Sequence, residues 1–257
     1  MKISVVTVSF NAGRTIGHTL ASFLEQEHAD KELLVIDGGS SDDTVAVARS
    51  FDHPSIRITS EPDGGLYDAM NKGLARFAGH AVGFLNADDR YQDAGVLGDI
   101  AEALTSADIV YGDLDFVDDH SSGKIVRSWR GQSWTPGAFA RGWMPPHPTF
   151  YVARKVVEAT GTFDTSLKIA ADYDYMLRAL ELGGFDHQFL QRVMVRMMVG
   201  GKSTSGLGGY VKSNLEALRV RQRHLGSGFV DRALLAKPLG KAGQFFVKRS
   251  AGSHVRP

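Results

Sequence analysis

The stretch ISVVTV, residues 3–8, decides the fold, because this short β-branched run ends at the turn-forming residues 9–13. A run of this kind is typical of a buried parallel strand. Apolar side chains at three- and four-residue spacing predict a helix over residues 15–27, and LLVI, residues 33–36, predicts a second apolar strand. The chain therefore starts with a predicted β-α-β unit.

The same alternation continues along the next part of the chain. Residues 40–43 carry cap-forming side chains before a helix expected over 45–48, and strands are expected at 56–58 and 81–85 with a helix at 67–77 between them. Strands that alternate with helices over about the first 110 residues predict an α/β fold, with a mostly parallel sheet covered by helices on both faces and built from right-handed crossovers.

The pattern changes after residue 112. Two apolar runs, 114–118 and 124–129, flank a turn-forming segment and predict a hairpin. The proline-rich stretch 143–148 predicts a loop, followed by an extended segment at 149–152 and a helix at 172–182. The second half is therefore expected to be α+β and to complete the same domain.

Composition excludes several kinds of chemistry. The chain has 257 residues, of which 43% are hydrophobic and 23% charged, as in an ordinary globular protein. It has no cysteine, which excludes disulfides, thiolate zinc sites, iron–sulfur clusters and a cysteine nucleophile. The first residues lack a small-residue cleavage site, so no signal peptide is expected. No stretch reaches the roughly 18 apolar residues that a membrane-spanning helix needs.

Charge is balanced overall but not along the chain. The 29 basic and 29 acidic side chains cancel, yet residues 212–257 hold ten Lys or Arg against two acids, a balance of +8. The rest of the chain therefore carries −8. This basic tail is open to two interpretations: an amphipathic helix with the run FFV at 245–247 resting on a lipid surface, or helices that pack on the domain or on another subunit. No base-reading motif accompanies the charge, so nucleic acid is not an expected partner.

Polar clusters follow three of the predicted strands, at 7–11, 37–42 and 86–89. In open parallel sheets ligands bind beyond the carboxyl ends of the strands, so these clusters are expected to converge on one site. Ser40 and Asp42 are equally explained as helix caps. Asp37 closes an apolar strand before two glycines, which suits recognition of a ribose or a base edge.

The acidic pair that ends FLNADD, residues 84–89, favours a cation. Carboxylates that directly follow a buried strand repel each other unless a cation or a donor offsets their charge. Mg²⁺ or Mn²⁺ prefers carboxylate oxygen, takes one or two protein ligands and leaves positions for a diphosphate. The sequence therefore predicts a divalent metal at this turn.

Four segments in order, TVSFN at 7–11, DGGSSDDT at 37–44, EPDGGLYDAMNKG at 61–73 and FLNADD at 84–89, together resemble family 2 glycosyltransferases of the GT-A fold. The likeness spans about residues 2–205 and is closest to the branch that acts in bacterial exopolysaccharide, capsule and colanic-acid assembly. Because the first position of the Asp-x-Asp motif is Asn86, the resemblance implies that Asn86 binds ribose or phosphate and that Asp88 binds the metal. It also implies that the nucleotide is held by Thr7, Ser9, Asn11, Asp37, Asn71 and Lys72.

The segment AADYDYMLR, residues 170–178, resembles the family's acidic helix start and implies that Asp172 is the catalytic base. In an inverting transfer this carboxylate takes the proton of the acceptor hydroxyl as its oxygen attacks the anomeric carbon opposite the leaving diphosphate. Asp174 is interpreted as a solvated first-turn charge. His147 could approach the acceptor or diphosphate or be structural, and Lys202, in a segment like the family's Gly-Gly-x-Ser ending, could contact the diphosphate.

Taken together, the motifs and the resemblance imply a metal-dependent, hexosyl-type inverting transfer from a UDP- or GDP-linked sugar to a growing cell-surface glycan, for which a lipid-linked acceptor is one candidate. A GT-A domain is expected at 1–205, with a nucleotide-binding half at 1–112 and an acceptor-binding half at 113–205, followed by a basic helical extension at 206–257. The expected location is cytoplasmic, with the inner face of the cell membrane as a peripheral site. The rivals are a catalytically silent nucleotide-sugar-binding or scaffold protein, favoured by Asn86, and a nucleotidylyltransferase.

Overall fold

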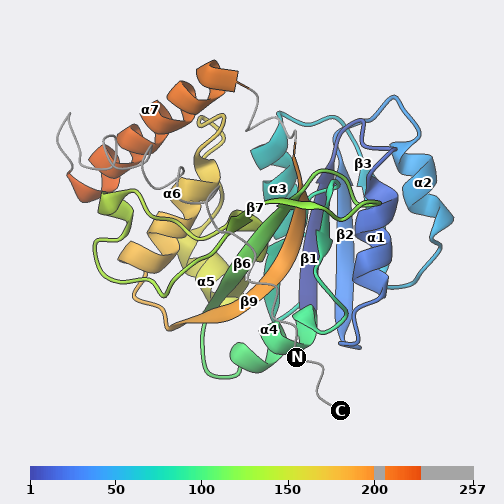
Figure 1. Ribbon diagram of the computed structural model, residues 1–257, viewed down its shortest axis with the longest axis horizontal. Helices are drawn as coiled ribbons and strands as arrows, with labels where there is room; N and C mark the ends of the chain where they lie inside the picture. Colours follow the sequence, from blue (N-terminus) through green and yellow to red (C-terminus); the bar gives the residue numbers. More distant parts are fainter. Residues whose placement is uncertain (200–205, 227–257) are drawn as a thin grey trace, which may run out of the picture.

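A mixed sheet forms the centre of the protein in a computed structural model that describes residues 1–199 and 206–226 (Figure 1). Its path is β3-β2-β1-β4-β8-β6-β9-β5, and β7 pairs with β6. The strands are β1 (Ile3–Ser9), β2 (Lys31–Asp37), β3 (Ile56–Ser60), β4 (Ala81–Phe84), β5 (Asp89–Tyr91), β6 (Ile109–Val117), β7 (Ile125–Trp129), β8 (Tyr151–Ala153) and β9 (His187–Met198).

The first four strands pair in parallel with one another, as predicted. Every residue of β1 is buried, and the helices α1 (Ile16–Leu24) and α3 (Leu66–Leu74) cover opposite faces of the sheet. Val5 of β1 belongs to the same core cluster as Leu20 of α1, whereas Val6 belongs to the cluster of Met70 of α3. The predicted β-α-β unit with helices on both faces is confirmed, and α2 (Thr44–Ser50) follows β2.

Antiparallel pairs join the second half to the same sheet. β8 lies antiparallel between β4 and β6, and β6 with β7 forms the predicted hairpin. The long strand β9, orange in Figure 1, runs parallel to β6 and pairs at its other edge with β5. The remaining helices are α4 (Val96–Ala103), α5 (Arg154–Thr160) and α6 (Ala171–Leu177), with short turns η1 (Phe139–Arg141), η2 (His147–Thr149) and the π-helical η3 (Arg178–Leu182).

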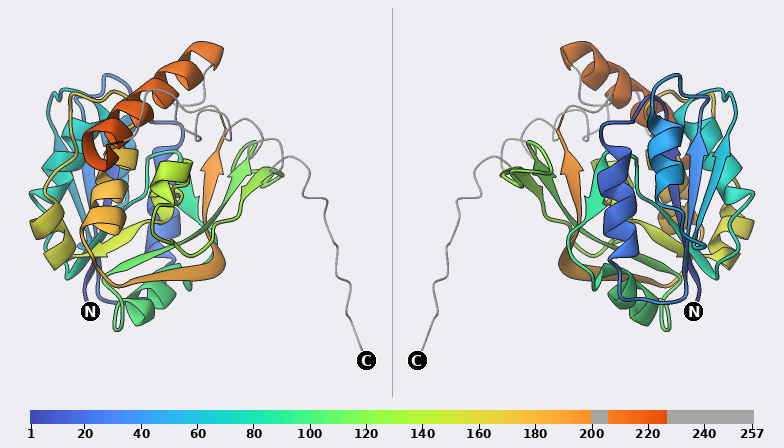
Figure 2. Two further views of the ribbon diagram at one scale, coloured as in Figure 1. Left: turned by 90° about the vertical axis from the view of Figure 1, so that its left-hand side faces the viewer. Right: turned by 90° about the vertical axis from the view of Figure 1, so that its right-hand side faces the viewer.

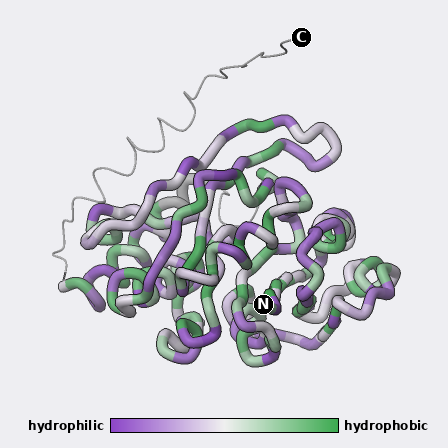
Figure 3. Tube along the Cα trace, turned by 90° about the horizontal axis from the view of Figure 1, so that it is seen from below, coloured by the Kyte–Doolittle hydropathy of each residue, from purple (hydrophilic) through white to green (hydrophobic). Residues whose placement is uncertain are grey.

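The last described helix, α7 (Gly206–Leu225), packs on α6 (Figure 2). Ala217, Leu218 and Val220 of α7 are buried. This part of the basic tail therefore covers the chain's own domain, the second of the two interpretations, and residues 227–257 with the run at 245–247 lie outside the described residues. Among the described residues no helix is long and apolar enough to cross a membrane, and Figure 3 shows hydrophobic and hydrophilic segments interleaved along the chain.

Candidate active site

The first two polar clusters meet, as predicted, at the carboxyl ends of β1 and β2. The backbone N–H of Asn11 donates to the Ser40 hydroxyl (2.8 Å), and the Asn11 carboxamide oxygen accepts from the N–H of Ser41 (2.9 Å). Asn11 has φ 52°, a left-handed conformation that Asn tolerates better than most residues. Asp42 accepts from the N–H of Gly13 (3.0 Å), so hydrogen bonds lock the two loops together.

The carboxylate of Asp37, at the end of β2, is fully buried and holds the second loop. Oδ1 accepts from the hydroxyls of Ser9 (3.0 Å) and Ser40. Oδ2 accepts from the N–H groups of Gly39 (3.1 Å) and Ser40 (2.9 Å) and from the Ser60 hydroxyl (2.8 Å). Burial raises the pKa of Asp37, but these hydrogen bonds outweigh it and bring the pKa below its ordinary value. A carboxylate offers about four acceptor positions, so a nucleotide base would have to displace one of these donors.

Thr7 lies on β1 beneath this loop, two residues before Ser9. Its side chain is fully buried, and Oγ1 has no hydrogen-bond partner within residues 1–199 and 206–226. Since an unpaired buried hydroxyl costs free energy, a group that reached Oγ1 would gain a hydrogen bond at this position. Thr7, Ser9, Asn11 and Asp37, which the sequence assigns to nucleotide binding, thus lie at one edge of the sheet.

The turn after β4 carries the predicted metal motif. Thr19 of α1 fixes its backbone by donating to the carbonyls of Asn86 (3.2 Å) and Asp89 (2.7 Å). The Asn86 side-chain N–H donates to Asp89 Oδ2 (3.2 Å). Two buried oxygens of the turn, Asn86 Oδ1 and Asp89 Oδ1, have no hydrogen-bond partner in the described chain. The turn is therefore rich in oxygen acceptors that lack donors.

The two carboxylates of this turn are poorly compensated by the protein. Burial raises the pKa of Asp88, and burial followed by the neighbouring charge of Asp88 raises the pKa of Asp89 well above its ordinary value. A ring nitrogen of His120 bonds the Asp88 carbonyl (2.8 Å), but burial lowers the pKa of that imidazole. No Lys or Arg in the described ranges pairs with either carboxylate.

The oxygen atoms of this turn fit a divalent cation that takes most of its ligands from a substrate. Within the part of the chain that the structure describes, no three His, Asp or Glu side chains converge as a complete metal site. Mg²⁺ and Mn²⁺ are commonly held by one or two carboxylates together with substrate phosphates. Asp88 can supply one such carboxylate. The unpartnered oxygen of Asn86 lies in the same turn.

Two residues of α3 that the sequence assigns to nucleotide binding, Asn71 and Lys72, use their side chains in contacts within the protein. The Asn71 carboxamide donates to the Phe163 carbonyl (3.0 Å) and accepts from the Phe163 N–H (2.8 Å), which uses both ends of the amide. Lys72 donates to the Pro62 carbonyl (2.8 Å) and forms an ion pair with Glu61 (3.2 Å). Both side chains thus join α3 to neighbouring loops.

The predicted base, Asp172, lies in the first turn of α6. Oδ1 accepts from the Tyr173 N–H (2.8 Å) and lies 3.4 Å from the Tyr67 hydroxyl of α3. Burial raises the pKa of Asp172, and the charge of His147 opposes that rise only in part. A carboxyl group with a raised pKa is a better proton acceptor than an exposed one. Oδ2 accepts no hydrogen bond from the described residues.

His147 links Asp172 to the end of β4. Its ring stacks on Phe84, the last residue of β4, with 5.3 Å between ring centroids. Burial lowers the pKa of His147, and the charge of Asp172 opposes this effect. Since Asn86 follows Phe84 by two residues, the predicted base, His147 and the metal turn lie around the carboxyl end of one strand.

The interpretation of Asp174 as a solvated first-turn charge is wrong. Only 2% of Asp174 is exposed, and its carboxylate accepts from Arg178 (2.8 Å) and from a ring nitrogen of His224 on α7 (2.9 Å). Arg178 lies one helical turn further along the chain, whereas the His224 contact depends on how α7 docks. Lys202 lies outside the described residues.

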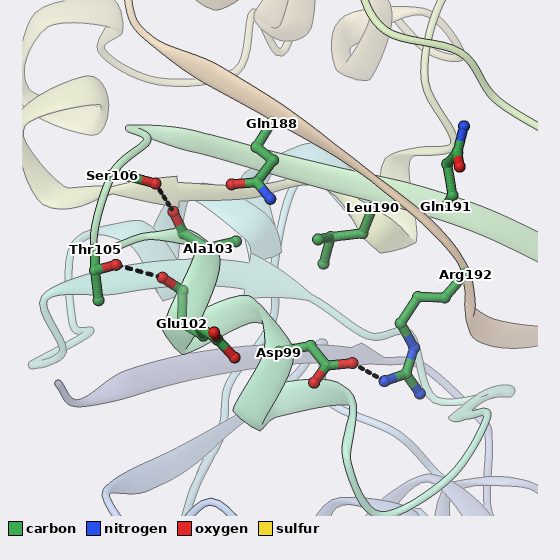
Figure 4. Close-up of a pocket in the computed structure, with 9 residues that line it drawn as sticks. All are labelled: Asp99, Glu102, Ala103, Thr105, Ser106, Gln188, Leu190, Gln191 and Arg192. Carbon is green, nitrogen blue, oxygen red and sulfur yellow. Dashed lines mark hydrogen bonds and ion pairs between the residues drawn. The ribbon is translucent and has the colours of Figure 1, made fainter.

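A small hollow adjoins the site, and a larger one lies elsewhere on the surface. The smaller, about 110 Å³, lies beside the Tyr67 phenol that reaches Asp172, and its other lining residues are Gly64, Gly65, Leu66, Asp68, Thr165, Leu167 and Lys168. The larger, about 440 Å³, lies between α4 and β9, where Arg192 pairs with Asp99 (Figure 4). It contains none of the predicted site residues.

Sequence analysis gave Tyr67 no role at the site, yet its hydroxyl lies 3.4 Å from Asp172 Oδ1. It also missed Glu216 of α7, whose carboxylate contacts the segment just before α6. A tyrosine at the start of a helix that follows two glycines was the available signal for Tyr67. No local pattern marks Glu216, because its partners are 46 to 48 residues away.

The sheet, its flanking helices and the acids at its carboxyl edge define a class of protein, the glycosyltransferases with the GT-A fold. The chain superposes on Staphylococcus aureus TarS 1–349 in complex with UDP-GlcNAc with a TM-score of 0.68 and 18% identity, covering 94% of this chain and 71% of that one. It superposes on the mannosyltransferase PcManGT of Pyrobaculum calidifontis, solved with GDP-Man and Mn²⁺, with a TM-score of 0.64 and 17% identity, covering 95% and 69%.

The family follows from sequence. The family described as Glycosyl transferase family 2 matches residues 4–164. An uncharacterized glycosyltransferase of Mycobacterium tuberculosis is 32% identical over 210 residues, 81% of this chain and 77% of the relative. A PGL/p-HBAD biosynthesis glycosyltransferase of Mycobacterium bovis is 29% identical over 187 residues, 68% of each chain. The chain belongs to glycosyltransferase family 2.

Proposed function

We propose that this glycosyltransferase moves a hexosyl unit from a UDP- or GDP-linked sugar to a hydroxyl of a growing glycan, with inversion at the anomeric carbon and Asp172 as the base. The supporting observation is the environment of Asp172: a carboxylate with a raised pKa, held through Oδ1 and with Oδ2 unengaged within the described chain. Oδ2 takes the acceptor proton, and the hydroxyl oxygen bonds to the anomeric carbon as the diphosphate leaves from the opposite face.

The other site residues bind and orient the donor in this proposal. The loops tied together by Asn11 and Asp37 receive the nucleotide, and Asn86 faces its ribose or phosphate. Asp88 would hold a divalent cation that offsets the charge developing on the leaving diphosphate. His147 keeps the base and this turn adjacent through its stack on Phe84.

The donor and acceptor classes rest on the relatives. TarS was solved with UDP-GlcNAc and PcManGT with GDP-Man and Mn²⁺, so the fold accommodates both nucleotide classes. The Mycobacterium bovis relative is named PGL/p-HBAD biosynthesis glycosyltransferase, which supports transfer of the sugar to an acceptor made by a biosynthetic pathway. A lipid-linked acceptor and the exopolysaccharide branch are part of the same proposal.

The test compares Asp172→Asn with the wild-type chain. We expect donor turnover with Mn²⁺ to fall by about 10² to 10⁴-fold, the usual contribution of a general base, while the Kd of UDP or GDP in calorimetry stays the same. Asp186→Asn, an exposed carboxylate directly before β9, is the matched control and should keep its turnover. Equal turnover in wild type and Asp172→Asn would refute the base assignment. Nucleotide binding without any turnover in the wild type would favour the silent binding protein.

A further inference from the structure

The carboxylate of Glu216 on α7 grips the backbone just before α6. Oε2 accepts three N–H groups in succession, from Lys168 (3.0 Å), Ile169 (2.8 Å) and Ala170 (3.1 Å). Only 5% of Glu216 is exposed. Charge-assisted hydrogen bonds are roughly twice as strong as neutral ones, so a buried carboxylate with three N–H donors is a strong anchor.

The same segment is held from its other side by the residue that touches the proposed base. The Tyr67 hydroxyl donates to the Ile169 carbonyl (2.6 Å) and lies 3.4 Å from Asp172 Oδ1. The peptide groups of Ile169 are therefore fixed by Glu216 on one side and Tyr67 on the other. Ala170, the residue that precedes α6, has no side chain that could cap the helix, so its position is set from outside.

Other contacts fix α7 itself against α6. Arg221 is 1% exposed and donates to the Tyr173 hydroxyl (3.3 Å), and its guanidinium lies 5.8 Å from the centre of that ring. His224 bonds Asp174 (2.9 Å). Glu216 thus extends from a helix that also contacts α6 at two further positions. These contacts hold its carboxylate in place beside residues 168–170.

We propose that Glu216 is a positioning residue for the transfer reaction: it sets the path of residues 168–170 and so the place of Asp172. This inference rests on the proposed function, in which Asp172 is the base. Without the carboxylate, three N–H groups lose their acceptor and the segment must shift to find water or another partner. The Tyr67 hydroxyl then either moves with the Ile169 carbonyl or loses its hydrogen bond to it. In either case the distance between the Tyr67 hydroxyl and the Asp172 carboxylate changes.

The expected effect falls on turnover and not on donor affinity. A misplacement of about 1 Å at a reacting group can cost about 100-fold in rate, so we expect kcat of Glu216→Ala to fall by about that factor. The donor contacts the loops after β1, β2 and β4, which Glu216 does not touch, so the donor KM and the UDP Kd should stay within about threefold. Glu216→Gln keeps an acceptor oxygen and should recover most of the lost kcat.

The experiment measures kcat, donor KM and amide hydrogen exchange on the full chain for these two variants and for Leu218→Ala. Leu218 is buried on the same helix but does not bond the segment, so its truncation serves as the stability-matched control. We expect exchange at 168–170 to accelerate in Glu216→Ala beyond its change in Leu218→Ala, with only Glu216→Ala losing kcat at an unchanged KM.

Three results would overturn the proposal: a kcat loss in Leu218→Ala equal to that in Glu216→Ala at matched melting temperatures, unchanged exchange at 168–170 in Glu216→Ala, or no recovery in Glu216→Gln. A wild-type chain that binds UDP or GDP but transfers no sugar would instead refute the proposed function. In that case the exchange rates still decide whether Glu216 holds the segment.

Discussion

Replacing Asn71 with Ala should destabilise the protein without weakening its donor affinity. The Asn71 carboxamide makes two hydrogen bonds to the backbone of Phe163, at 3.0 and 2.8 Å, across a sequence separation of 92 residues. Phe163 is 2% exposed, so its N–H and carbonyl groups have little access to replacement water. Each hydrogen bond contributes about 1 kcal/mol, and each stranded buried group costs about 1 to 3 kcal/mol.

We therefore expect Asn71→Ala to lower the free energy of unfolding by about 2 to 4 kcal/mol. For a chain of this size 1 kcal/mol corresponds to about 2 to 4 °C, so the melting temperature should fall by about 5 to 15 °C. Calorimetric unfolding gives the stability, and titration with UDP or GDP in the presence of Mn²⁺ gives the donor Kd. Lys72→Ala is the control one residue along, where loss of a surface ion pair should cost no more than about 1 kcal/mol.

The reasoning fails if Asn71→Ala melts at the wild-type temperature and binds nucleotide more than tenfold more weakly. That result would restore the nucleotide-binding role that the sequence assigned to Asn71. A loss of both stability and binding, with Lys72→Ala unchanged, would mean that the α3 contact with Phe163 shapes the nucleotide site.

Three further predictions concern pH and packing. Because burial raises the pKa of Asp172 and the base must be ionised, kcat should fall as pH drops through that raised pKa, and this acid limb should disappear from the residual rate of Asp172→Asn. The folded-state pKa of Asp89 is raised above its unfolded value, so its ionisation costs stability as pH rises past about 4. In urea unfolding in chelator-treated buffer, Asp89→Asn should therefore be more stable than the wild type by about 1 to 3 kcal/mol at pH 7 and no more stable below about pH 4. A Cβ at Gly83 would lie 2.3 Å from the ring of Tyr151, so Gly83→Ala should lose about 1 to 3 kcal/mol in the same assay, and unchanged stability would contradict the packing.

The parallel half of the fold could be predicted because its strands are short buried runs. The runs at 3–8 and 33–36 are fully buried in β1 and β2, where period-two alternation is not expected. The strand β9 carried no such signal, because only Met194 and Val195 of its twelve residues are buried and polar residues interrupt its apolar ones. Among the described strands, the three-residue strand β5 pairs with β9 alone.

The acids of the site were predictable one cluster at a time, since each follows a strand. Their partners were not. Local sequence gives no indication that the carboxylate of Asp37 accepts five hydrogen bonds, or that the Asn71 carboxamide bonds the backbone of Phe163. Asp174 looked like a first-turn surface charge, and only the docking of α7 brings His224 to it. Contacts between distant segments decide which polar residues remain available to a ligand.

The anchor that Glu216 provides has a consequence for synthesis of the chain. Glu216 emerges 48 residues after Lys168, which takes about 2 to 10 s at ordinary translation rates of 5 to 20 residues per second. The strands β1 to β4 can pair during that interval, whereas the turn into α6 still lacks its acceptor. On the ribosome, therefore, the half of the sheet built from β1 to β4 is ready for assembly before the helix that carries Asp172 reaches its final place.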